Sequence, residues 1–326
     1  MIRKFISKYS GFLRSLKIVY VFNNLFNKKK LVHNKSIYEK YGLQKSIFSS
    51  IGKRDFVSAS SDIPWLDKEN GFRQLENNPD FEALSPELKA EVKNFIDKGY
   101  IILKGFYSTE AVNALNKEVD QLKNSGTVDF NYTGKKIMES FKYSEMIDEG
   151  FFRNPRLLSL LDFLMGKKIV PFHTINFIQG SEQKAHSDSI HMTTEPEGYL
   201  IAAWTALEST HKNNGPLFYY PESHKLPYIT CQDYDSGNNR WLIGNNSYKK
   251  YEDRIEELIK EKNLKKEYFF AEPGDVFIWH ANLLHGGDPI RSEDLTRKSM
   301  VAHYFCQDVI CYHEISQRPA LIPDVE

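Results

Sequence analysis

Three residues of the chain, His186, Asp188 and His285, combine types and spacing that suit a metal centre. They lie in the segments AHSDSIHM and HANLLHGG. Two histidines and one carboxylate make up the facial triad that holds non-haem Fe(II) and leaves coordination positions open. On an extended backbone His186 and Asp188 point to the same side, while His285 must arrive from another strand. Ten histidines make an H-x-D pair common by chance, so a loop histidine beside a surface aspartate is the alternative.

Arg297 lies downstream of the triad and offers a partner for an anion. Strand alternation places Arg297, Ser299, Val301 and His303 on one face of a predicted strand. An arginine that faces an apolar interior needs an anionic partner, because its charge cannot be removed. A dicarboxylate cosubstrate supplies that partner with a bidentate fit, and a structural ion pair is the alternative. The triad and the arginine together favour the cosubstrate.

The elements that must position these side chains change in kind along the chain. The patterns predict helices over 86–98, 108–122 and 156–165, with a strand at 100–103 after the first. Short strands are predicted at 169–179, 199–208, 217–220, 267–271, 275–280 and 297–306, with a helix at 251–262 between them. Helices first and short strands later indicate an α+β fold whose strands form a sandwich or barrel.

Composition excludes some classes of function. Lys+Arg and Asp+Glu are both 43 in 326 residues, so the chain as a whole gives no argument for nucleic-acid binding. Three cysteines without C-x-x-C spacing suggest neither a disulfide framework nor a zinc site. We therefore expect a reducing cytoplasm, which also suits Fe(II).

Residues 1–60 are predicted to be a basic N-terminal appendage that ends in the polar stretch 58–61, and residues 61–326 a single catalytic domain. Residues 1–35 carry nine basic residues and no acidic one. One helical face is predicted from the apolar residues Ile2, Phe5, Ile6, Tyr9, Phe12, Leu13 and Leu16. The apolar run is too short to cross a bilayer, and no signal-peptide cleavage site follows it. Peripheral contact of residues 1–35 with the inner face of a membrane, or packing on the catalytic body, both fit this pattern.

A series of motifs resembles the phytanoyl-CoA dioxygenase family of Fe(II)- and 2-oxoglutarate-dependent oxygenases. The similarity covers about residues 85–306. It runs through GYIILKGFYSTEAVNALNKEVDQL, AHSD, WTALEST, NNGPLFYYPESHK, PGDVFIWHANLLHGG and TRKSMVAHYF, in the order of the family. HSDSIHM and the pairing of HGG with TRKS look most like a bacterial branch with largely unassigned substrates.

This resemblance implies a double-stranded β-helix (jelly-roll) core with buttressing helices. It assigns Fe(II) to the triad and the far carboxylate of 2-oxoglutarate to Arg297. Trp204 is expected beside the cosubstrate, and Ile175 and Lys136 fall near other cosubstrate-lining positions.

One position departs from the pattern of the family. Some relatives place a small hydroxyl two residues after the distal histidine, where this chain has Gly287. Any hydroxyl bond to the carboxylate must therefore come from elsewhere, and Ser299 is the candidate.

Several other residues have structural interpretations. Trp279 and Phe277 are expected to fill the core, and His224 to shape a turn. His303 is interpreted as a hydrogen-bonded core residue, and His191 either faces substrate or lies in a surface loop. Residues 228–248 form either a substrate lid or a long surface loop.

The resemblance implies a dioxygenase that uses O2, releases succinate and CO2, and hydroxylates a C–H bond. Asp188 favours hydroxylation, because related halogenases lack the carboxylate ligand. No phosphate-binding basic cluster of the kind an acyl-CoA needs is visible, so a small molecule, lipid or glycan intermediate is expected as substrate. Two alternatives are another metal-dependent (cupin-like) enzyme and a non-catalytic jelly-roll binding module.

Overall fold

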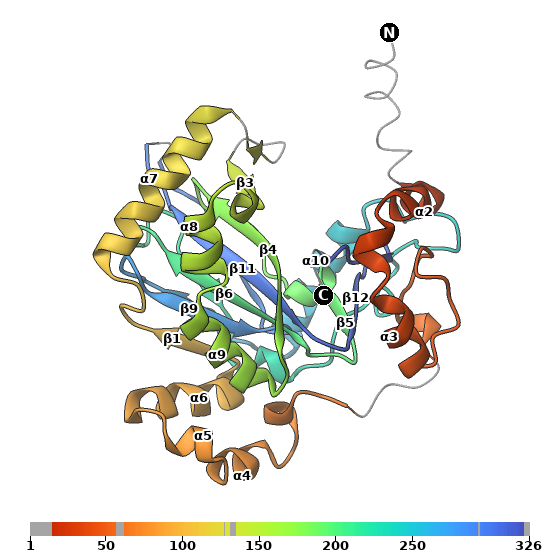
Figure 1. Cartoon of the computed structure of the whole chain (residues 1–326), viewed down its shortest axis with the longest axis horizontal. Helices are drawn as coiled ribbons and strands as arrows, with labels where there is room; N and C mark the ends of the chain where they lie inside the picture. The colour runs from red at the N-terminus through yellow and green to blue at the C-terminus, as the bar shows by residue number, and fades with distance from the viewer. Residues whose placement is uncertain (1–14, 57–61, 127, 131–134, 293, 323–326) are drawn as a thin grey trace.

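The computed structural model describes residues 15–56, 62–126, 128–130, 135–292 and 294–322. Most of the predicted N-terminal apolar face, from Ile2 to Leu13, and the whole of the polar stretch 58–61 lie outside the described residues. Helices dominate the first half of the described chain and strands the second half (Figure 1). The expected α+β class is therefore confirmed.

The largest element is an antiparallel sheet of seven strands in the described chain. Its order is β1 (Tyr100–Leu103), β9 (Val276–His280), β6 (Leu200–Ala206), β11 (Ser299–Cys306), β4 (Ile169–Phe177), β3 (Lys136–Met138) and β2 (Asp129–Phe130). Alternation decides which side chains face which layer. Along β6, Ile201 and Ala203 join one core cluster, and Ala202 and Trp204 join another on the opposite face.

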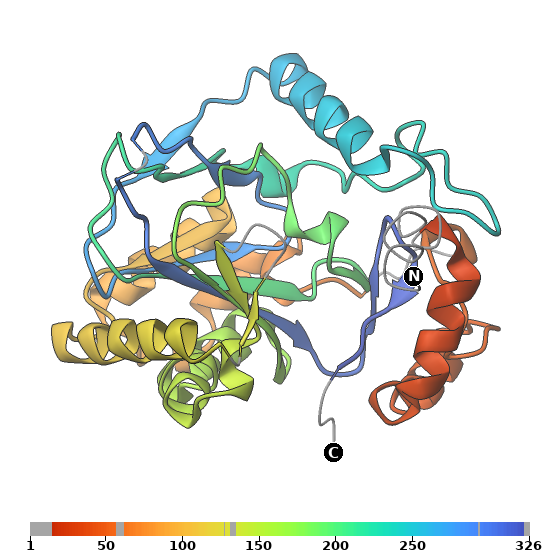
Figure 2. The same cartoon turned by 90° about the horizontal axis from the view of Figure 1, so that it is seen from above.

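Helices cover the first of these faces (Figure 2). The principal ones are α6 (Pro86–Lys98), α7 (Thr109–Ser125) and α9 (Pro155–Met165). Each begins within one residue of the predicted start, because Ser85, Ser108 and Asn154 accept hydrogen bonds from backbone N–H groups of the first turn. Shorter helical segments are η3 (Trp65–Asp67), α4 (Gly71–Glu76), α5 (Pro79–Glu82), η4 (Ser140–Lys142), α8 (Glu145–Ile147) and the π-helix η5 (Asp148–Phe152).

Two small antiparallel sheets lie on the other side of the large sheet. One has the order β10 (His285–Gly287), β7 (Leu217–Tyr219) and β8 (Glu267–Phe269), and the other β13 (Arg318–Pro319), β12 (Ile310–His313) and β5 (Thr193–Glu195). Leu217 and Tyr219 pack against the inner face of the large sheet. Outside β7 lies α10 (Ser247–Glu261), and the turns η6 (Asp188–Ile190) and η7 (Ser223–Lys225) complete this layer. In the described chain these sheets face one another without closing into one continuous barrel.

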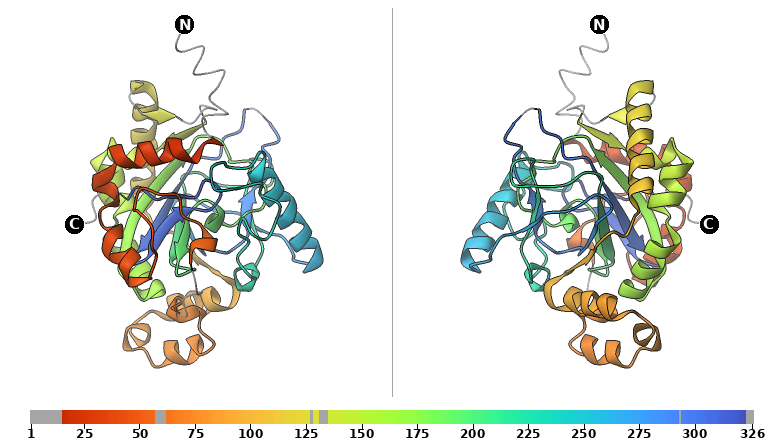
Figure 3. Two further views of the ribbon diagram at one scale, coloured as in Figure 1. Left: turned by 90° about the vertical axis from the view of Figure 1, so that its right-hand side faces the viewer. Right: turned by 90° about the vertical axis from the view of Figure 1, so that its left-hand side faces the viewer.

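The N-terminal segment packs along one end of the sheets, as the left view of Figure 3 shows. It contains α2 (Lys17–Phe26), η1 (Lys28–Leu31), α3 (Asn34–Lys40) and η2 (Lys53–Asp55). Its apolar residues, such as the fully buried Leu31, form a core cluster with Ile310 and Tyr312 of β12. The amide of Lys17 also donates to the carbonyl of Trp241 at 2.9 Å. None of the described helices is long and apolar enough to cross a membrane.

Two expectations for the ligand segments need correction. Asp188 does not continue an extended strand, because it begins the 3-10 turn η6. Arg297 precedes β11 by two residues rather than lying within the strand. The predicted helix at 251–262 begins four residues earlier, at Ser247.

Candidate active site

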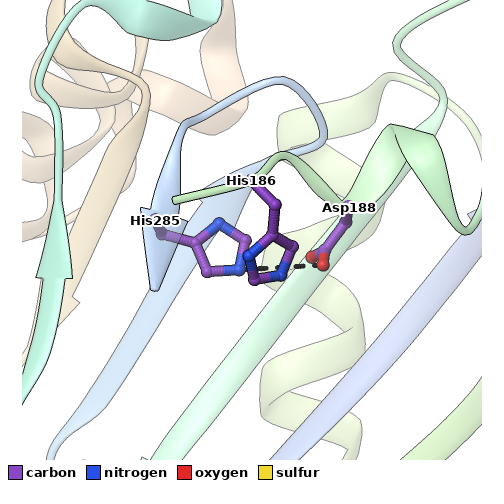
Figure 4. A group of neighbouring side chains, drawn as sticks. All are labelled: His186, Asp188 and His285. Atoms are coloured by element: carbon purple, nitrogen blue, oxygen red, sulfur yellow. Dashed lines mark ion pairs between the residues drawn. The ribbon is translucent and has the colours of Figure 1, made fainter. Parts of the chain in front are cut away.

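The side chains of His186, Asp188 and His285 converge at one point between the layers (Figure 4). All three are buried, and one ligand atom from each lies within 4.8 Å of the others. His285 begins β10, and Asp188 begins η6. His186 joins them through an isolated β-bridge, in which the amides and carbonyls of His186 and His285 exchange hydrogen bonds of 3.0 and 2.9 Å.

Backbone carbonyls fix the orientation of both imidazole rings. His186 Nδ1 lies 2.8 Å from the carbonyl of Lys184, and His285 Nδ1 lies 2.9 Å from that of Leu283. A carbonyl only accepts, so each Nδ1 carries the proton and donates it. Each Nε2 is therefore left with a lone pair, which is the form that binds a metal.

The carboxylate of Asp188 is held from two sides. Trp279 donates its indole N–H to Oδ2 at 2.7 Å, and His303 Nε2 lies 3.4 Å from the same oxygen. Oδ1 lies 3.7 Å from Nε2 of His285. The interpretation of Trp279 as mere core filling is therefore incomplete, because its N–H orients the predicted carboxylate ligand.

Charge at the triad suits a divalent cation. Burial, and then the neighbouring His285, lowers the pKa of His186 to about 4, and burial lowers that of His285. Burial alone would raise the pKa of Asp188, but His285 and then His303 hold it well below its usual range. Two neutral imidazoles and one carboxylate are thus available at neutral pH, and this donor set fits Fe(II).

Arg297 is 1% exposed and lies over Phe177 and Trp204, with its guanidinium carbon 5.5 Å from each ring centroid. Within the described residues no carboxylate forms an ion pair with it, and its Nε has no hydrogen-bond partner. Burial lowers the pKa of Arg297 to about 10, so it stays charged at neutral pH. A buried cation with unused donors fits the far carboxylate of a dicarboxylate.

Strand register places Trp204 and Ile175 in one row and Lys136 in the next row of the same sheet. Val301 of β11 pairs with Trp204 of β6 on one side and with Ile175 of β4 on the other. Lys136 of β3 pairs with Phe177, and its ammonium lies 4.9 Å from that ring centroid. All of these residues line the cavity that contains the triad.

Comparison with known proteins identifies the family. A family model described as phytanoyl-CoA dioxygenase (PhyH) matches residues 95–299, which is more than half of the chain. The chain belongs to the phytanoyl-CoA dioxygenase family. It is 27% identical over 253 residues to the peroxisomal phytanoyl-CoA dioxygenase of Bos taurus, covering 69% of this chain and 70% of that protein. The ectoine dioxygenase of Halomonas elongata is 25% identical over 255 residues, covering 73% and 74%.

Solved structures share the fold of this dioxygenase. The structure of EctD from S. alaskensis with bound Fe has a TM-score of 0.53 at 21% identity, covering 68% of this chain and 77% of that one. The carbocyclase SnoK from nogalamycin biosynthesis has a TM-score of 0.56 at 16% identity, covering 71% and 87%. The expected jelly-roll core is thereby confirmed. The chain is an Fe(II)- and 2-oxoglutarate-dependent dioxygenase that uses O2 and acts on a small molecule.

The hydroxyl of Ser181 lies beside Gly287 in the dioxygenase, and it was not predicted from the sequence. A Cβ at Gly287 would lie 2.5 Å from Ser181 Oγ and 3.7 Å from a guanidinium nitrogen of Arg297. The hydroxyl of Ser181 thus occupies the space that a larger residue at 287 would fill. Ser299, the candidate from sequence, lies 3.4 Å from Arg297 Nη1 through its own hydroxyl. Both hydroxyls are therefore close to the arginine, and only one of them was anticipated.

The cavity of the dioxygenase measures about 650 Å³, within the usual range for a small-molecule site. His191 lies in its wall, with its ring 6.1 Å from that of His186, rather than in a surface loop. His224 lies outside the cavity lining and is 3.2 Å from the carbonyl of Ile96 through Nε2. Residues 228–248 do not line the cavity either, and they lie against α2 instead.

Glu139 and His173 form a polar pair in the cavity wall that was not predicted from the sequence. Glu139 accepts a short hydrogen bond from Nδ1 of His173, and Lys142 pairs with its other oxygen at 2.8 Å. Glu139 has a left-handed backbone (φ 56°), which is uncommon for a residue other than glycine. His173 lies beside a register shift between β11 and β4. The sequence carries no signal for the left-handed backbone of Glu139 or for the register shift beside His173, because strand pairing determines them.

Proposed function

We propose that His186, Asp188 and His285 hold Fe(II), that Arg297 binds the far carboxylate of 2-oxoglutarate, and that the dioxygenase hydroxylates a C–H bond of a small molecule, lipid or glycan intermediate. The observation that carries the cosubstrate assignment is Arg297, a buried cation without a carboxylate partner among the described residues. It lines the same cavity as the triad.

Each residue of the site has a separate role in this reaction. Bound Fe(II) with 2-oxoglutarate and O2 supplies the oxidation, which yields succinate and CO2 and leaves a hydroxyl group on the substrate. His186 and His285 present neutral Nε2 atoms because backbone carbonyls occupy their Nδ1 protons. Trp279 aims the carboxylate of Asp188. Trp204 and Phe177 keep water from the guanidinium of Arg297, which strengthens its attraction for an anion.

Spectroscopy tests the metal and cosubstrate assignment. Under anaerobic conditions, Fe(II) and 2-oxoglutarate together should produce a weak visible charge-transfer band with the wild-type chain. His285→Ala should abolish the band, because one of three ligands is lost. A folded, metal-loaded wild-type chain without the band would contradict the assignment.

Arg297 is tested by separating the affinities for metal and cosubstrate. Arg297→Ala should weaken 2-oxoglutarate binding and leave Fe(II) affinity close to that of the wild type, because the arginine touches no metal ligand. Arg291→Ala is the matched control, since Arg291 is exposed. An equal loss of both affinities in Arg297→Ala would indicate a structural arginine.

We also propose that the N-terminal segment contacts an anionic lipid surface. The outer face of α2 exposes Ile18, Phe22, Leu25 and Phe26, at the spacing of one helical face, and Phe26 is 90% exposed. Lys28 and Lys29 are exposed directly after it. Apolar side chains flanked by lysines, in a segment without acidic residues up to position 35, are complementary to anionic headgroups.

Vesicle sedimentation tests this contact. The full chain should sediment with vesicles of phosphatidylcholine and phosphatidylglycerol, and far less with phosphatidylcholine alone. The double variant Phe22→Ser, Phe26→Ser should lose binding, whereas Phe270→Ser, at a residue 51% exposed elsewhere, should not. Equal sedimentation of all three proteins would refute the α2 surface as the contact.

A further inference from the structure

The charges that line the catalytic cavity do not balance at its open end. Most charged side chains there have an evident partner: Glu139 pairs with Lys142 and His173, and Asp188 lies among histidines. Arg297 is assigned above to the cosubstrate. Lys136 packs over the ring of Phe177. Two further cations, Lys30 and Arg318, line the same cavity and have no ion pair within the described residues. The entrance therefore carries a positive charge that the described chain leaves uncompensated.

The backbones that carry these two cations are firmly placed. Lys30 precedes Leu31, which is 0% exposed in the cluster that joins the N-terminal segment to β12. Arg318 begins β13 and pairs with His313 of β12. A side-chain bond of 2.5 Å from Lys17 to Gln317 ties α2 to the same hairpin.

Contacts between α2 and β13 bring the two cations to one rim. The guanidinium of Arg318 lies 5.8 Å from the ring centroid of Tyr20 on α2. The amide side chain of Asn23, one helical turn further along α2, also lines the cavity. A guanidinium, an ammonium and an amide, carried by separate segments, thus border one opening.

From this rim we infer that the substrate carries a phosphate-type anionic group, which Lys30 and Arg318 bind while the carbon to be oxidised lies deeper in the cavity. The inference rests on the proposed function, because it names the substrate class of the same site. Donors from separate segments suit a tetrahedral anion that offers several oxygens in different directions, whereas one arginine alone can match a carboxylate. The N-terminal segment then forms part of the substrate site as well as an outer layer.

Titration with inorganic phosphate tests the rim directly. Calorimetry is carried out anaerobically at low salt on the full chain loaded with Fe(II) and 2-oxoglutarate, while the visible band is recorded. We expect saturable binding that leaves the band unchanged. Lys30→Ala and Arg318→Ala should each weaken phosphate binding about 10- to 100-fold, the value of one hydrogen bond to a charged group. Lys30→Arg should retain binding, and Lys29→Ala is the matched control, because Lys29 does not line the cavity.

Each other outcome overturns the inference in a recognisable way. Binding without saturation, or an equal loss in Lys29→Ala, would mean diffuse attraction only. Tighter binding of acetate than of phosphate would mean a carboxylate site. Loss of vesicle binding in Lys30→Ala and Arg318→Ala, with phosphate binding intact, would mean that the cations face lipid headgroups. If no band forms, the catalytic proposal fails, and phosphate titration of the metal-free chain and its variants still decides the inference.

Discussion

The indole of Trp279 shows how much of this site depends on side chains that are not ligands. It donates to Asp188 Oδ2 at 2.7 Å and is 3% exposed, so no water competes for the bond. Its ring centroid also lies 4.5 Å from that of His285. One residue of β9 therefore packs against one predicted ligand and orients another, and partners of this kind tune the affinity of a metal site.

Trp279→Phe should weaken Fe(II) binding about 10- to 100-fold, because the carboxylate of Asp188 loses its orienting donor while the core keeps an aromatic ring. Anaerobic Fe(II) titration measures the change. Trp65→Phe is the control, since its indole donates to the carbonyl of Phe163, on the helical side of the large sheet. A loss no larger than that of the control would contradict the orienting role.

At the residue scale, the sequence could predict the side chains whose chemistry is unusual for their setting. His186, Asp188 and His285 stand out by ligand type, and Arg297 by its charge directly before an apolar segment. The supporting residues could not be predicted in this way. Ser181 is an ordinary serine in a loop, and only the close approach of Gly287 reveals its place.

At the scale of elements, the joint between α6 and β1 depends on Gly99. This residue ends α6 in a left-handed conformation (φ 87°), and its carbonyl accepts a hydrogen bond from His280 of β9 at 3.0 Å. A Cβ here would lie 2.5 Å from Nδ1 of His224. The end of α6, the start of β1 and the turn that carries His224 therefore meet at Gly99.

Gly99→Ala should lower the free energy of unfolding by about 2–3 kcal/mol, since it combines backbone strain with a steric clash. Urea denaturation measures this loss. Gly105→Ala isolates the strain, because Gly105 also has a positive φ of 57° but no atom lies within 4 Å of the added Cβ. That control should lose about 1 kcal/mol. Equal losses in the two variants would show that His224 moves aside without cost.

The elements that sequence predicts well are those specified locally. Ser85 and Gly99 bound α6, and Ser108 starts α7, as their cap chemistry predicts. Of the short strands, β7 and β8 were predicted, whereas β3, β5 and β10 were not. Their residues become strands only because a distant partner pairs with them, and period-two patterns need more residues than these strands contain.

At the scale of the whole molecule, buried histidines link stability to pH. Burial lowers the pKa to about 4 for His186 and His313 and to about 3 for His224, against 6.5 for an exposed histidine. The unfolded chain therefore takes up more protons than the folded chain between these values. The contribution of these histidines to stability falls as pH drops below 6.5, and it stops changing near pH 3.

His224→Gln should flatten this dependence in the metal-free chain. The variant removes one such group, so its free energy of unfolding should fall less steeply between pH 6 and pH 4, by about 1.4 kcal/mol per pH unit. Urea denaturation at several pH values measures the slope. His211→Gln, at an exposed position, should keep the wild-type slope. A slope unchanged in His224→Gln would show that His224 gains its proton in the folded state.

The division of the chain at residue 60 stays a prediction. The N-terminal segment shares a core cluster with β12, so its contacts join it to the catalytic body. Sequence could mark the basic segment by composition. It could not show that this segment reaches the cavity, because its partners lie nearly 280 residues further along the chain.

That packing has a consequence for the order of events during synthesis. The ribosome releases α2, η1 and α3 long before Ile310 and Tyr312, which cover their apolar side chains. These helices must therefore wait while nearly 280 further residues are added before their native contacts exist, and such delays expose nascent chains to misassembly. The rim formed by Lys30 and Arg318 can likewise assemble only after translation has reached β13.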